Sequence, residues 1–183
     1  MPAAVGKTYN FQMSLAPYLL ALSVLAAVGS GLVAGLLFAF STAVMKSLAR
    51  LPAEHGMRAM QHINVAILNP LFLAAFMGTA LLSAVLVPGA LLRWNAPASF
   101  WLLSGAAAYL IGTLGVTMAV NVPLNNRLAA TDAAATDAAN VWTDYVEKWV
   151  RWNHLRTLAG IVAALSFTLA ASYLRAGSLQ ASY

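Results

Sequence analysis

Long runs of apolar residues separated by short polar segments dominate this sequence. Four of these runs carry almost no charged side chains, and each holds the roughly 17 to 25 mainly apolar residues that a helix needs to cross a bilayer. The pattern therefore predicts four membrane-spanning helices, at about residues 17–44, 63–87, 99–122 and 154–174. We expect an all-α, antiparallel four-helix bundle in which residues 1–183 form a single transmembrane domain.

Two of the predicted helices are longer than the bilayer is thick. The second helix is predicted at about residues 52–87, because a proline and an acidic residue, both typical of a first helical turn, stand at its start. Side-chain oxygens that can cap a helix place the fourth at about residues 136–175. Both helices then extend beyond the membrane, on the side of residues 46–62 and 127–153.

Proline and small residues predict local features of these helices. Pro70 lacks a backbone donor, so the second helix should kink there and leave the Ala66 carbonyl unpaired. Ala27, Gly31 and Gly35 recur every fourth position of the first helix, which places them on one stripe. Such a stripe allows another helix to approach closely, so we expect helix packing there.

The composition agrees with a membrane protein and excludes several kinds of chemistry. Only 8% of the residues are charged, against about 25% in a soluble domain. There is no Cys, which excludes disulfides, a thiolate-ligated haem and a CxxC redox pair. Three His and five acidic residues, with no HExxH or ExxH pair on a span, leave little material for a metal site, and the sequence leaves open whether a metal binds through His62 and His154. In a membrane protein a net charge of +5 reports orientation and predicts no nucleic-acid partner.

The basic residues are distributed unevenly between the two ends of the predicted bundle. One end carries Lys7, Arg93 and Arg175. The other carries Lys46, Arg50, Arg58, Arg127, Lys148, Arg151 and Arg156. Because cytoplasmic loops are enriched in Lys and Arg, we expect the connections at 46–62 and 127–153 to be cytoplasmic and both termini to lie on the opposite side.

Polar residues converge on that same end of the bundle. The second predicted helix carries Gln61, His62, Asn64 and Asn69. At 100° of rotation per residue, these four side chains project within about 160° of the helix circumference. The third helix adds Asn121 and Asn125. On the fourth helix, residues spaced by 3, 4, 3 and 4 positions form one stripe along the helix surface: Trp142, Tyr145, Trp149, Trp152 and Arg156. Asn153 lies beside this stripe.

Each of these residues also has an explanation that involves no chemistry. Trp and Tyr are enriched at membrane interfaces, Arg156 can reach the lipid headgroups, and intramembrane amides often bridge helices. His62 can be a hydrogen-bonded residue of a helix contact. These separate explanations do not account for the clustering at one end. Since no Asp or Glu occurs in any span, Arg156 pairs with amide or carbonyl oxygens, with lipid phosphate or with an anionic substrate.

The sequence resembles the anthrone oxygenase-like family of small four-helix integral membrane proteins, most of them classed as a domain of unknown function. Four blocks carry the resemblance: Gly31–Phe40, Met60–Asn64 with Asn69–Phe72, Asn121–Asn125, and Trp149–Thr157. The blocks cover nearly the whole chain in the order and spacing of the family. The resemblance implies a membrane oxygenase that uses O₂, without a bound metal or flavin, on a phenolic polycyclic or quinol-type aromatic, as when an anthrone becomes an anthraquinone.

Within that chemistry, the residues take distinct expected roles. His62 is the candidate base, because imidazole is the only intramembrane group here that titrates near neutral pH. The expected oxyanion donors are Arg156, Asn64, Asn121 and Asn153. Trp149 and Trp152 would stack on the flat ring system, and Asn69, Asn125 and Trp142 would complete the substrate contacts.

A second hypothesis uses the same cavity without chemistry. The chain would then be a membrane protein that binds or passes an apolar aromatic or quinone-like molecule, or an accessory subunit. In both cases the expected partners are the lipid bilayer and an aromatic small molecule. The sequence leaves open which molecule that is, and whether the bundle assembles as a homo-oligomer.

Overall fold

The computed structural model describes the backbone of residues 2–180 and the side chains of residues 15–177, so the side chain of Lys7 lies outside the described residues. Every element in the described part is helical. In chain order they are α1 (Pro2–Ala39), η1 (Phe40–Val44), α2 (Met45–Leu48), α3 (Ala53–Ala66), α4 (Pro70–Leu92), α5 (Pro97–Ala107), η2 (Ala108–Gly115), η3 (Thr117–Asn121), α6 (Val122–Ala129) and α7 (Ala138–Gln180), where η marks a π-helical segment.

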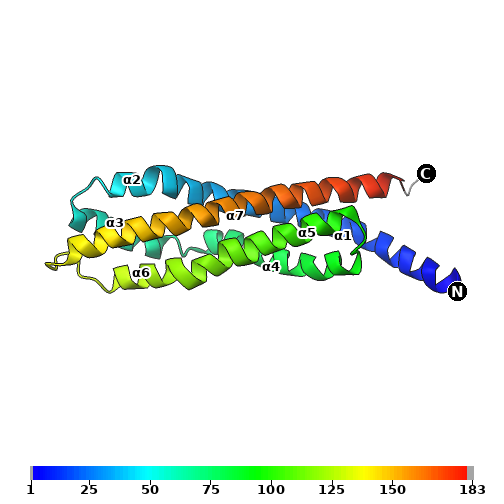
Figure 1. Cartoon of the computed structure of the whole chain (residues 1–183), viewed down its shortest axis with the longest axis horizontal. Helices are drawn as coiled ribbons and strands as arrows, with labels where there is room; N and C mark the ends of the chain where they lie inside the picture. The colour runs from blue at the N-terminus through cyan, green and yellow to red at the C-terminus, as the bar shows by residue number, and fades with distance from the viewer. Residues whose placement is uncertain (1, 181–183) are drawn as a thin grey trace.

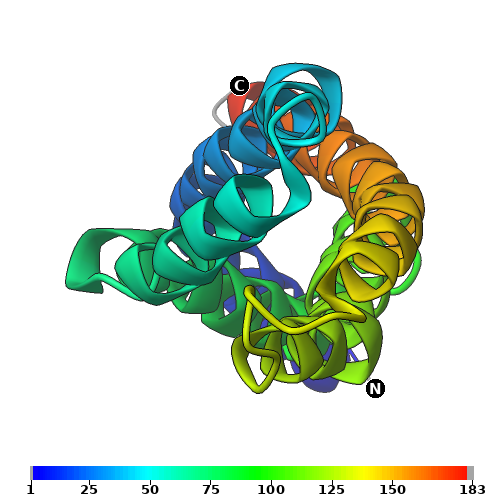
Figure 2. The same ribbon diagram turned by 90° about the vertical axis from the view of Figure 1, so that its left-hand side faces the viewer.

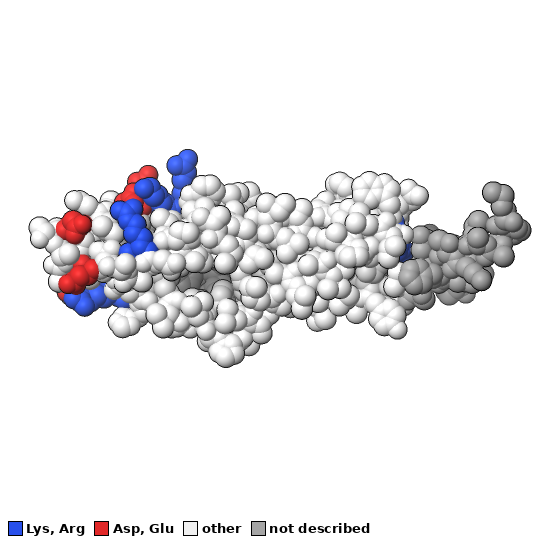
Figure 3. All heavy atoms as spheres, turned by 90° about the horizontal axis from the view of Figure 1, so that it is seen from below, with Lys and Arg blue, Asp and Glu red and all other residues white. Residues whose placement is uncertain are grey.

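The helices form an elongated bundle in which α1 packs along α7 (Figure 1). Four helical segments are long and apolar enough to cross a membrane: Leu15–Leu48, Pro70–Leu92, Pro97–Ala129 and Ala138–Gly177. This confirms the predicted all-α fold class and a multi-pass integral membrane protein. Charged side chains gather at the end formed by α2, α3 and the α6–α7 connection, and on the face seen in Figure 3 the described surface beyond them is almost free of charge.

Two apolar clusters of buried residues follow each other along the bundle. The cluster nearer the termini joins α1, α4, α5 and α7 through residues such as Leu86, Leu102 and Phe167. The cluster at the charged end joins α2, α3, α6 and α7 through residues such as Met57 and Trp142. The polar site described below is built at the charged end of the bundle.

The second predicted helix is two helices, so the prediction of one kinked helix was wrong. Asn69, directly before Pro70, has φ −82° and ψ 158°, because a proline disfavours the α conformation in the residue before it. The Asn69 Oδ1 accepts a hydrogen bond from the Phe72 N–H at 3.0 Å, which caps α4. Its Nδ2 donates to the Ala66 carbonyl at 3.1 Å, so the carbonyl expected to be unpaired has a partner.

The third predicted helix continues past its predicted end at Val122 and runs to Ala129. Pro123 lies in the first turn of α6, directly after the π-helical segment Thr117–Asn121. Because the chain is helical on both sides of Pro123, its missing N–H and its ring would disturb an ordinary α-helical turn before it. The wider π turn before it thus lets the chain pass a proline and stay helical.

Within the predicted stripe Ala27 packs against the apolar core, but Gly31 and Gly35 meet no other helix of the described structure, contrary to the prediction. Both glycines are exposed, and a Cβ added at either would have no atom outside its own helix backbone within 4 Å. The close contact between α1 and α7 lies instead at Gly160, where a Cβ would be 3.0 Å from the Ala34 Cβ. A neighbouring face of α1 is therefore the one that packs.

We expect Gly56→Ala to lower the thermal stability of the protein in detergent. A Cβ at Gly56 would lie 2.7 Å from the Leu48 carbonyl oxygen and 2.9 Å from Cζ2 of Trp142, and overpacking of this kind costs about 1–3 kcal/mol. Gly31→Ala is the matched control, because its Cβ would enter open space and removing a mid-helix glycine stabilises by about 0.5–1 kcal/mol. Equal melting temperatures for the two variants would contradict this packing of α3 on α7.

Candidate functional site

A cavity of about 300 Å³ lies at the charged half of the bundle, between α1, the α3–α4 region, the η3–α6 region and α7. Figure 2 looks along the bundle from this end, with α3 in teal, α6 in yellow-green and α7 in orange to yellow. Most of the lining is apolar; the lining residues include Leu36, Leu37, Phe40, Met60, Ile63, Val65, Ile67, Leu68, Phe72 and Val122. The polar ones are Gln61, Asn64, Thr117, Asn125, Asn126 and Arg156, with the indole of Trp149.

The cavity lining continues to the outer surface of the bundle beside the α3–α4 break. Val65 and Leu68 belong to the lining and are 75% and 62% exposed. Both are apolar and lie just before the membrane-spanning helix α4. An apolar molecule dissolved in the bilayer therefore meets apolar side chains at this edge of the cavity.

Arg156 is the buried cation of this site. Its side chain is on α7 and is 5% exposed. One terminal nitrogen donates to the Asn153 Oδ1 at 2.6 Å and the other to the Thr117 Oγ1 at 3.2 Å. Its Nε has no hydrogen-bond partner within the described structure, and its Cζ lies 5.2 Å from the ring centroid of Trp149. The guanidinium is thus held by neutral groups and an aromatic face, and by no carboxylate among the described residues.

Asn153 fixes that guanidinium to the first helix. It is fully buried, and its Nδ2 donates to the Leu37 carbonyl at 2.7 Å and to the Ser41 Oγ at 2.6 Å. Because a backbone carbonyl only accepts hydrogen bonds, the amide nitrogen must face α1 and the amide oxygen must face Arg156. Asn153 therefore positions Arg156 and is itself outside the cavity lining.

A second network surrounds Trp149. The Asn125 Oδ1 on α6 accepts from the Trp149 Nε1 at 3.0 Å and from the Tyr145 hydroxyl at 2.9 Å. The same hydroxyl accepts from the Asn64 Nδ2 on α3 at 3.5 Å. One tyrosine thus connects the three helices that enclose the polar part of the cavity.

Gln61 connects α3 to the end of α6. Its Nε2 donates to the carbonyls of Leu128 and Thr131 at 2.8 and 3.0 Å. Those carbonyls lie at the C-terminal end of α6, where a helix leaves its last carbonyls without partners. The side chain of Gln61 therefore closes this helix end while lining the cavity.

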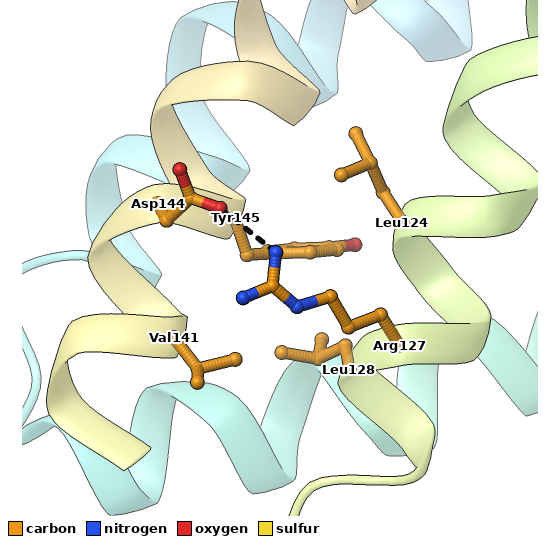
Figure 4. Close-up of a pocket in the computed structure, with 6 residues that line it drawn as sticks. All are labelled: Leu124, Arg127, Leu128, Val141, Asp144 and Tyr145. Carbon is orange, nitrogen blue, oxygen red and sulfur yellow. Dashed lines mark hydrogen bonds and ion pairs between the residues drawn. The ribbon is translucent and has the colours of Figure 1, made fainter. Parts of the chain in front are cut away.

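An ion pair between α6 and α7 lies at the outer end of the bundle, as Figure 4 shows. Arg127 of α6 lies 3.2 Å from a carboxylate oxygen of Asp144 on α7. Lys148 lies 2.6 Å from the other carboxylate oxygen. The space beside the pair has a volume of only about 10 Å³ and is lined partly by Tyr145, so it holds at most one water molecule. This space is therefore too small for an aromatic ligand, unlike the cavity of about 300 Å³ that Trp149 and Arg156 line.

Two residues of the network around Arg156 lie in π-helical segments. Ser41, which Asn153 bonds, belongs to η1, and Thr117, which Arg156 bonds, begins η3. π-Helical turns in otherwise α-helical segments are frequent at functional sites. Asn121, the last residue of η3, donates to the Trp149 carbonyl at 3.4 Å, while its buried Oδ1 has no partner in the described structure.

A family model described as anthrone oxygenase matches residues 68–166, a little more than half of the chain. The chain belongs to the anthrone oxygenase family. The match confirms the resemblance and includes α4, α5 and α6 with most of α7, and so it includes Arg156 and Asn153. Neither a curated protein nor a solved structure matches the chain.

In this anthrone oxygenase family member, the structure brings only part of the predicted site together. Four predicted residues line the cavity: Asn64, Asn125, Trp149 and Arg156. Asn121 and Asn153 lie directly behind them, buried and bonded to α7 and to α1.

The remaining four predicted residues lie elsewhere. His62 is exposed and, like Trp152, is outside the lining. Trp142 is buried against Gly56 and stacks on Tyr145 with ring centroids 5.8 Å apart, and Asn69 caps α4. Among the described side chains, no His, Asp or Glu lines the cavity and no group of three or more of them could hold a metal ion.

Sequence reasoning missed several residues of this site. Thr117 bonds Arg156, Gln61 and Tyr145 hold α3 to α6 and α7, and Phe40 and Phe72 supply aromatic walls. The sequence carried a signal for four of these residues. Gln61 belongs to the polar arc of the second predicted helix and Tyr145 to the aromatic stripe of the fourth. Phe40 and Phe72 belong to the blocks that carry the family resemblance. Thr117 had none, since a threonine in a membrane helix usually bonds its own backbone.

Proposed function

We propose that this anthrone oxygenase family member binds a phenolic polycyclic or quinol-type aromatic in the cavity and oxidises it with O₂, as in the conversion of an anthrone to an anthraquinone. The observation that carries the proposal is a buried guanidinium without a carboxylate partner at a mainly apolar cavity. A volume of about 300 Å³ lies at the lower end of the roughly 300–1,000 Å³ of small-molecule sites. Membership of the family supports the oxidation itself.

The proposed reaction converts an activated CH₂ group and O₂ into a ketone and water. The CH₂ loses a proton, and the resulting enolate, which is electron-rich, passes an electron to O₂. A carbon–oxygen bond then forms, and loss of water with the second hydrogen leaves the new carbonyl. One oxygen atom of O₂ ends in the product and the other in water, so atoms and electrons balance without a further reductant.

Arg156 would carry the electrostatic part of this reaction. A cation held in a water-poor cavity stabilises an oxyanion much more strongly than it would in water. It therefore favours the enolate, the form of the substrate that reacts with O₂. Trp149, whose ring already faces the guanidinium, would stack on the aromatic skeleton. The proton would pass to water at the exposed edge of the cavity or to His62.

The proposal is tested with purified protein in lipid nanodiscs, supplied with anthrone and air-saturated buffer. We expect quinone formation, followed by absorbance, and matching O₂ uptake, both well above the rates with empty nanodiscs. Rates equal to those of empty nanodiscs would overturn the oxygenase proposal for this protein.

The variant His62→Ala tests whether the proton of the substrate CH₂ group passes to His62 or to water. Because His62 is exposed and outside the lining, we expect the variant to keep the rate of quinone formation within about threefold of wild type. A rate reduced by the 10²–10⁴-fold typical of a lost general base would instead assign the proton to His62.

The second candidate is a protein that binds or passes the aromatic molecule unchanged. It is favoured by one observation: no side chain that titrates near neutral pH lines the cavity among the described residues. Anthrone that binds in the nanodisc assay but stays chemically unchanged in air would support this candidate over the enzyme.

For the orientation we propose that the connections 46–62 and 127–153 face the cytoplasm. The charged end of the bundle supports this through the rule that cytoplasmic loops are rich in Lys and Arg. The chain has no Cys, so labelling of a single cysteine introduced by Ser47→Cys in intact cells tests it. Labelling from outside would contradict the orientation.

A further inference from the structure

The positive charge of Arg156 is balanced by no carboxylate among the described residues, and its hydrogen-bonding capacity is only partly used. Its terminal nitrogens bond Asn153 and Thr117, but a guanidinium has more N–H donors than these two acceptors occupy. The side chain belongs to the cavity lining. An anion that enters the cavity therefore meets a charge of opposite sign together with free donors.

A neutral donor on α6 adds to this charge. The Asn125 oxygen accepts from the Trp149 Nε1 at 3.0 Å and from the Tyr145 hydroxyl at 2.9 Å. Because an indole N–H only donates, the amide must turn its oxygen to Trp149, and its Nδ2, which has no partner in the described structure, remains a donor. Asn125 and Arg156 both contact Trp149 and both line the cavity. The polar part of the lining thus suits the oxygens of a carboxylate.

The rest of the cavity suits a hydrocarbon chain. Apolar side chains such as Leu36 and Phe72 continue the lining away from Arg156, and at the α3–α4 break the lining reaches Val65 and Leu68. These last two side chains are 75% and 62% exposed, just before the membrane-spanning helix α4. A chain whose polar head is bound at Arg156 therefore has an apolar route out of the bundle into the bilayer.

Arg156 also lies at a depth that the head of a membrane amphiphile can reach. The exposed Arg151 precedes it on α7 by five residues, a distance of about 7.5 Å along an α-helix. Arg151 belongs to the charged end of the bundle, which lies at the level of the lipid headgroups in the proposed arrangement. A carboxylate that reaches Arg156 from the bilayer surface thus moves inward by little more than one helical turn, while its chain stays among apolar groups.

From these features we infer that the cavity binds a single-chain fatty acid of the bilayer, with its carboxylate at Arg156 and Asn125 and its chain toward Leu68. Hydrogen bonds between a guanidinium and a carboxylate are among the strong ones in proteins. A volume of about 300 Å³ favours one chain over the two chains and larger headgroup of a phospholipid. The inference goes beyond the proposed function: the binding does not depend on it, and only competition of the fatty acid with an aromatic substrate rests on it.

Photolabelling of the full chain in phosphatidylcholine nanodiscs tests the binding. The probes are a fatty acid with a diazirine in its chain, at alkaline pH where the acid is ionised, and its methyl ester, which has no charge. Labelled peptides are located by mass spectrometry. We expect saturable labelling at residues 60–72, half-saturated by the acid at a mole fraction in the bilayer at least about tenfold lower than by the ester, the effect of a hydrogen bond to a charged group.

Two results of this measurement would overturn the inference. One is half-saturation at the same mole fraction for the acid and the ester, because the cation then contributes nothing to binding. The other is loss of the labelling by the acid when phosphatidylglycerol is added at the mole fraction of the acid. That result would assign the site to the headgroup of an anionic phospholipid.

Substitutions at two arginines of α7 locate the carboxylate. Arg156→Gln should reduce the difference between acid and ester to about threefold or less. Arg151→Gln is the matched control, the same change at an exposed arginine of the same helix, and should leave the difference unchanged. Thr117→Asp keeps Arg156 but places a carboxylate at its hydrogen-bond partner, so it should also reduce the difference.

An undiminished difference in folded Arg156→Gln and Thr117→Asp proteins would contradict the inference, and so would an equal loss in Arg151→Gln, which would show that the surface charge of the bundle is sufficient. Charge-dependent labelling in a protein that forms no quinone from anthrone would refute the oxygenase and leave the inference intact. Quinone formation without such labelling would do the reverse.

Discussion

Arg156→Gln is expected to lower the rate of quinone formation by about 10²–10³-fold, the usual loss when a donor to a developing oxyanion is removed from a water-poor site. Glutamine can still donate one hydrogen bond, but it carries no charge. The stabilisation of the enolate by a cation is then lost. The measurement is the single-turnover rate with anthrone in nanodiscs, together with the affinity for anthraquinone.

The same variant should be at least as stable as wild type. Taking a cation out of water is costly, and Arg156 recovers that cost through two neutral acceptors and one aromatic face instead of a carboxylate. Its removal relieves the protein of a buried charge. A thermal melt that drops sharply for Arg156→Gln, with a rate within about threefold of wild type, would show that the arginine serves the fold and not the chemistry.

Arg156→Lys separates charge from shape. Lysine keeps the positive charge, but it has one ammonium group in place of a planar fork that bonds Asn153 and Thr117 together. We expect a rate between those of wild type and the glutamine variant. A lysine variant no faster than the glutamine variant would mean that the geometry of the fork is required as well.

Much of the fold was predictable because the bilayer imposes a strong and simple constraint. A helix in lipid must be long and apolar, and such runs are visible in any hydrophobic pattern. Two of the errors fell at prolines, Pro70 and Pro123. Sequence rules treat both as disturbances of a helix, yet Asn69 with Pro70 ends one helix and caps the next, whereas a π turn carries the chain past Pro123.

The site was predictable only as far as helical periodicity defines a face. Asn64 and Asn125 line the cavity, in keeping with the tendency of polar groups within a membrane bundle to turn inward. An arc of 160° is wider than the part of α3 that faces the cavity, so His62 fell outside it. Trp142 shares the stripe of Trp149 but lies nearly two turns further from the membrane, where it meets Gly56.

The hydrogen-bond polarity of the cavity could not be read from the sequence at all. An asparagine presents either a donor or an acceptor, and only its neighbours decide which. Those neighbours come from other parts of the chain: Trp149 decides for Asn125, and the carbonyls at the end of α6 decide for Gln61. The chemical character of the site therefore depends on tertiary structure, although its residues were visible beforehand.

Thr117→Asp is expected to abolish most of the activity without removing any group that contacts the substrate in our proposal. The Thr117 Oγ1 accepts a hydrogen bond from Arg156 at 3.2 Å, so a carboxylate in its place gives the buried cation a counter-ion. The paired guanidinium no longer attracts an enolate. We expect a rate close to that of Arg156→Gln, with a melting temperature at or above that of wild type because a buried charge has gained a partner.

Thr117→Asn is the matched control for this last experiment, because asparagine has the size and shape of aspartate and differs from it by the charge. Its amide oxygen can still accept from Arg156 and leaves the cation available. We therefore expect Thr117→Asn to keep the rate within about tenfold of wild type, while Thr117→Asp falls at least tenfold below the Asn variant. If the two variants have the same rate, the uncompensated charge of Arg156 does not drive the reaction. Arg156 would then serve the stability of the fold and not the binding of a substrate.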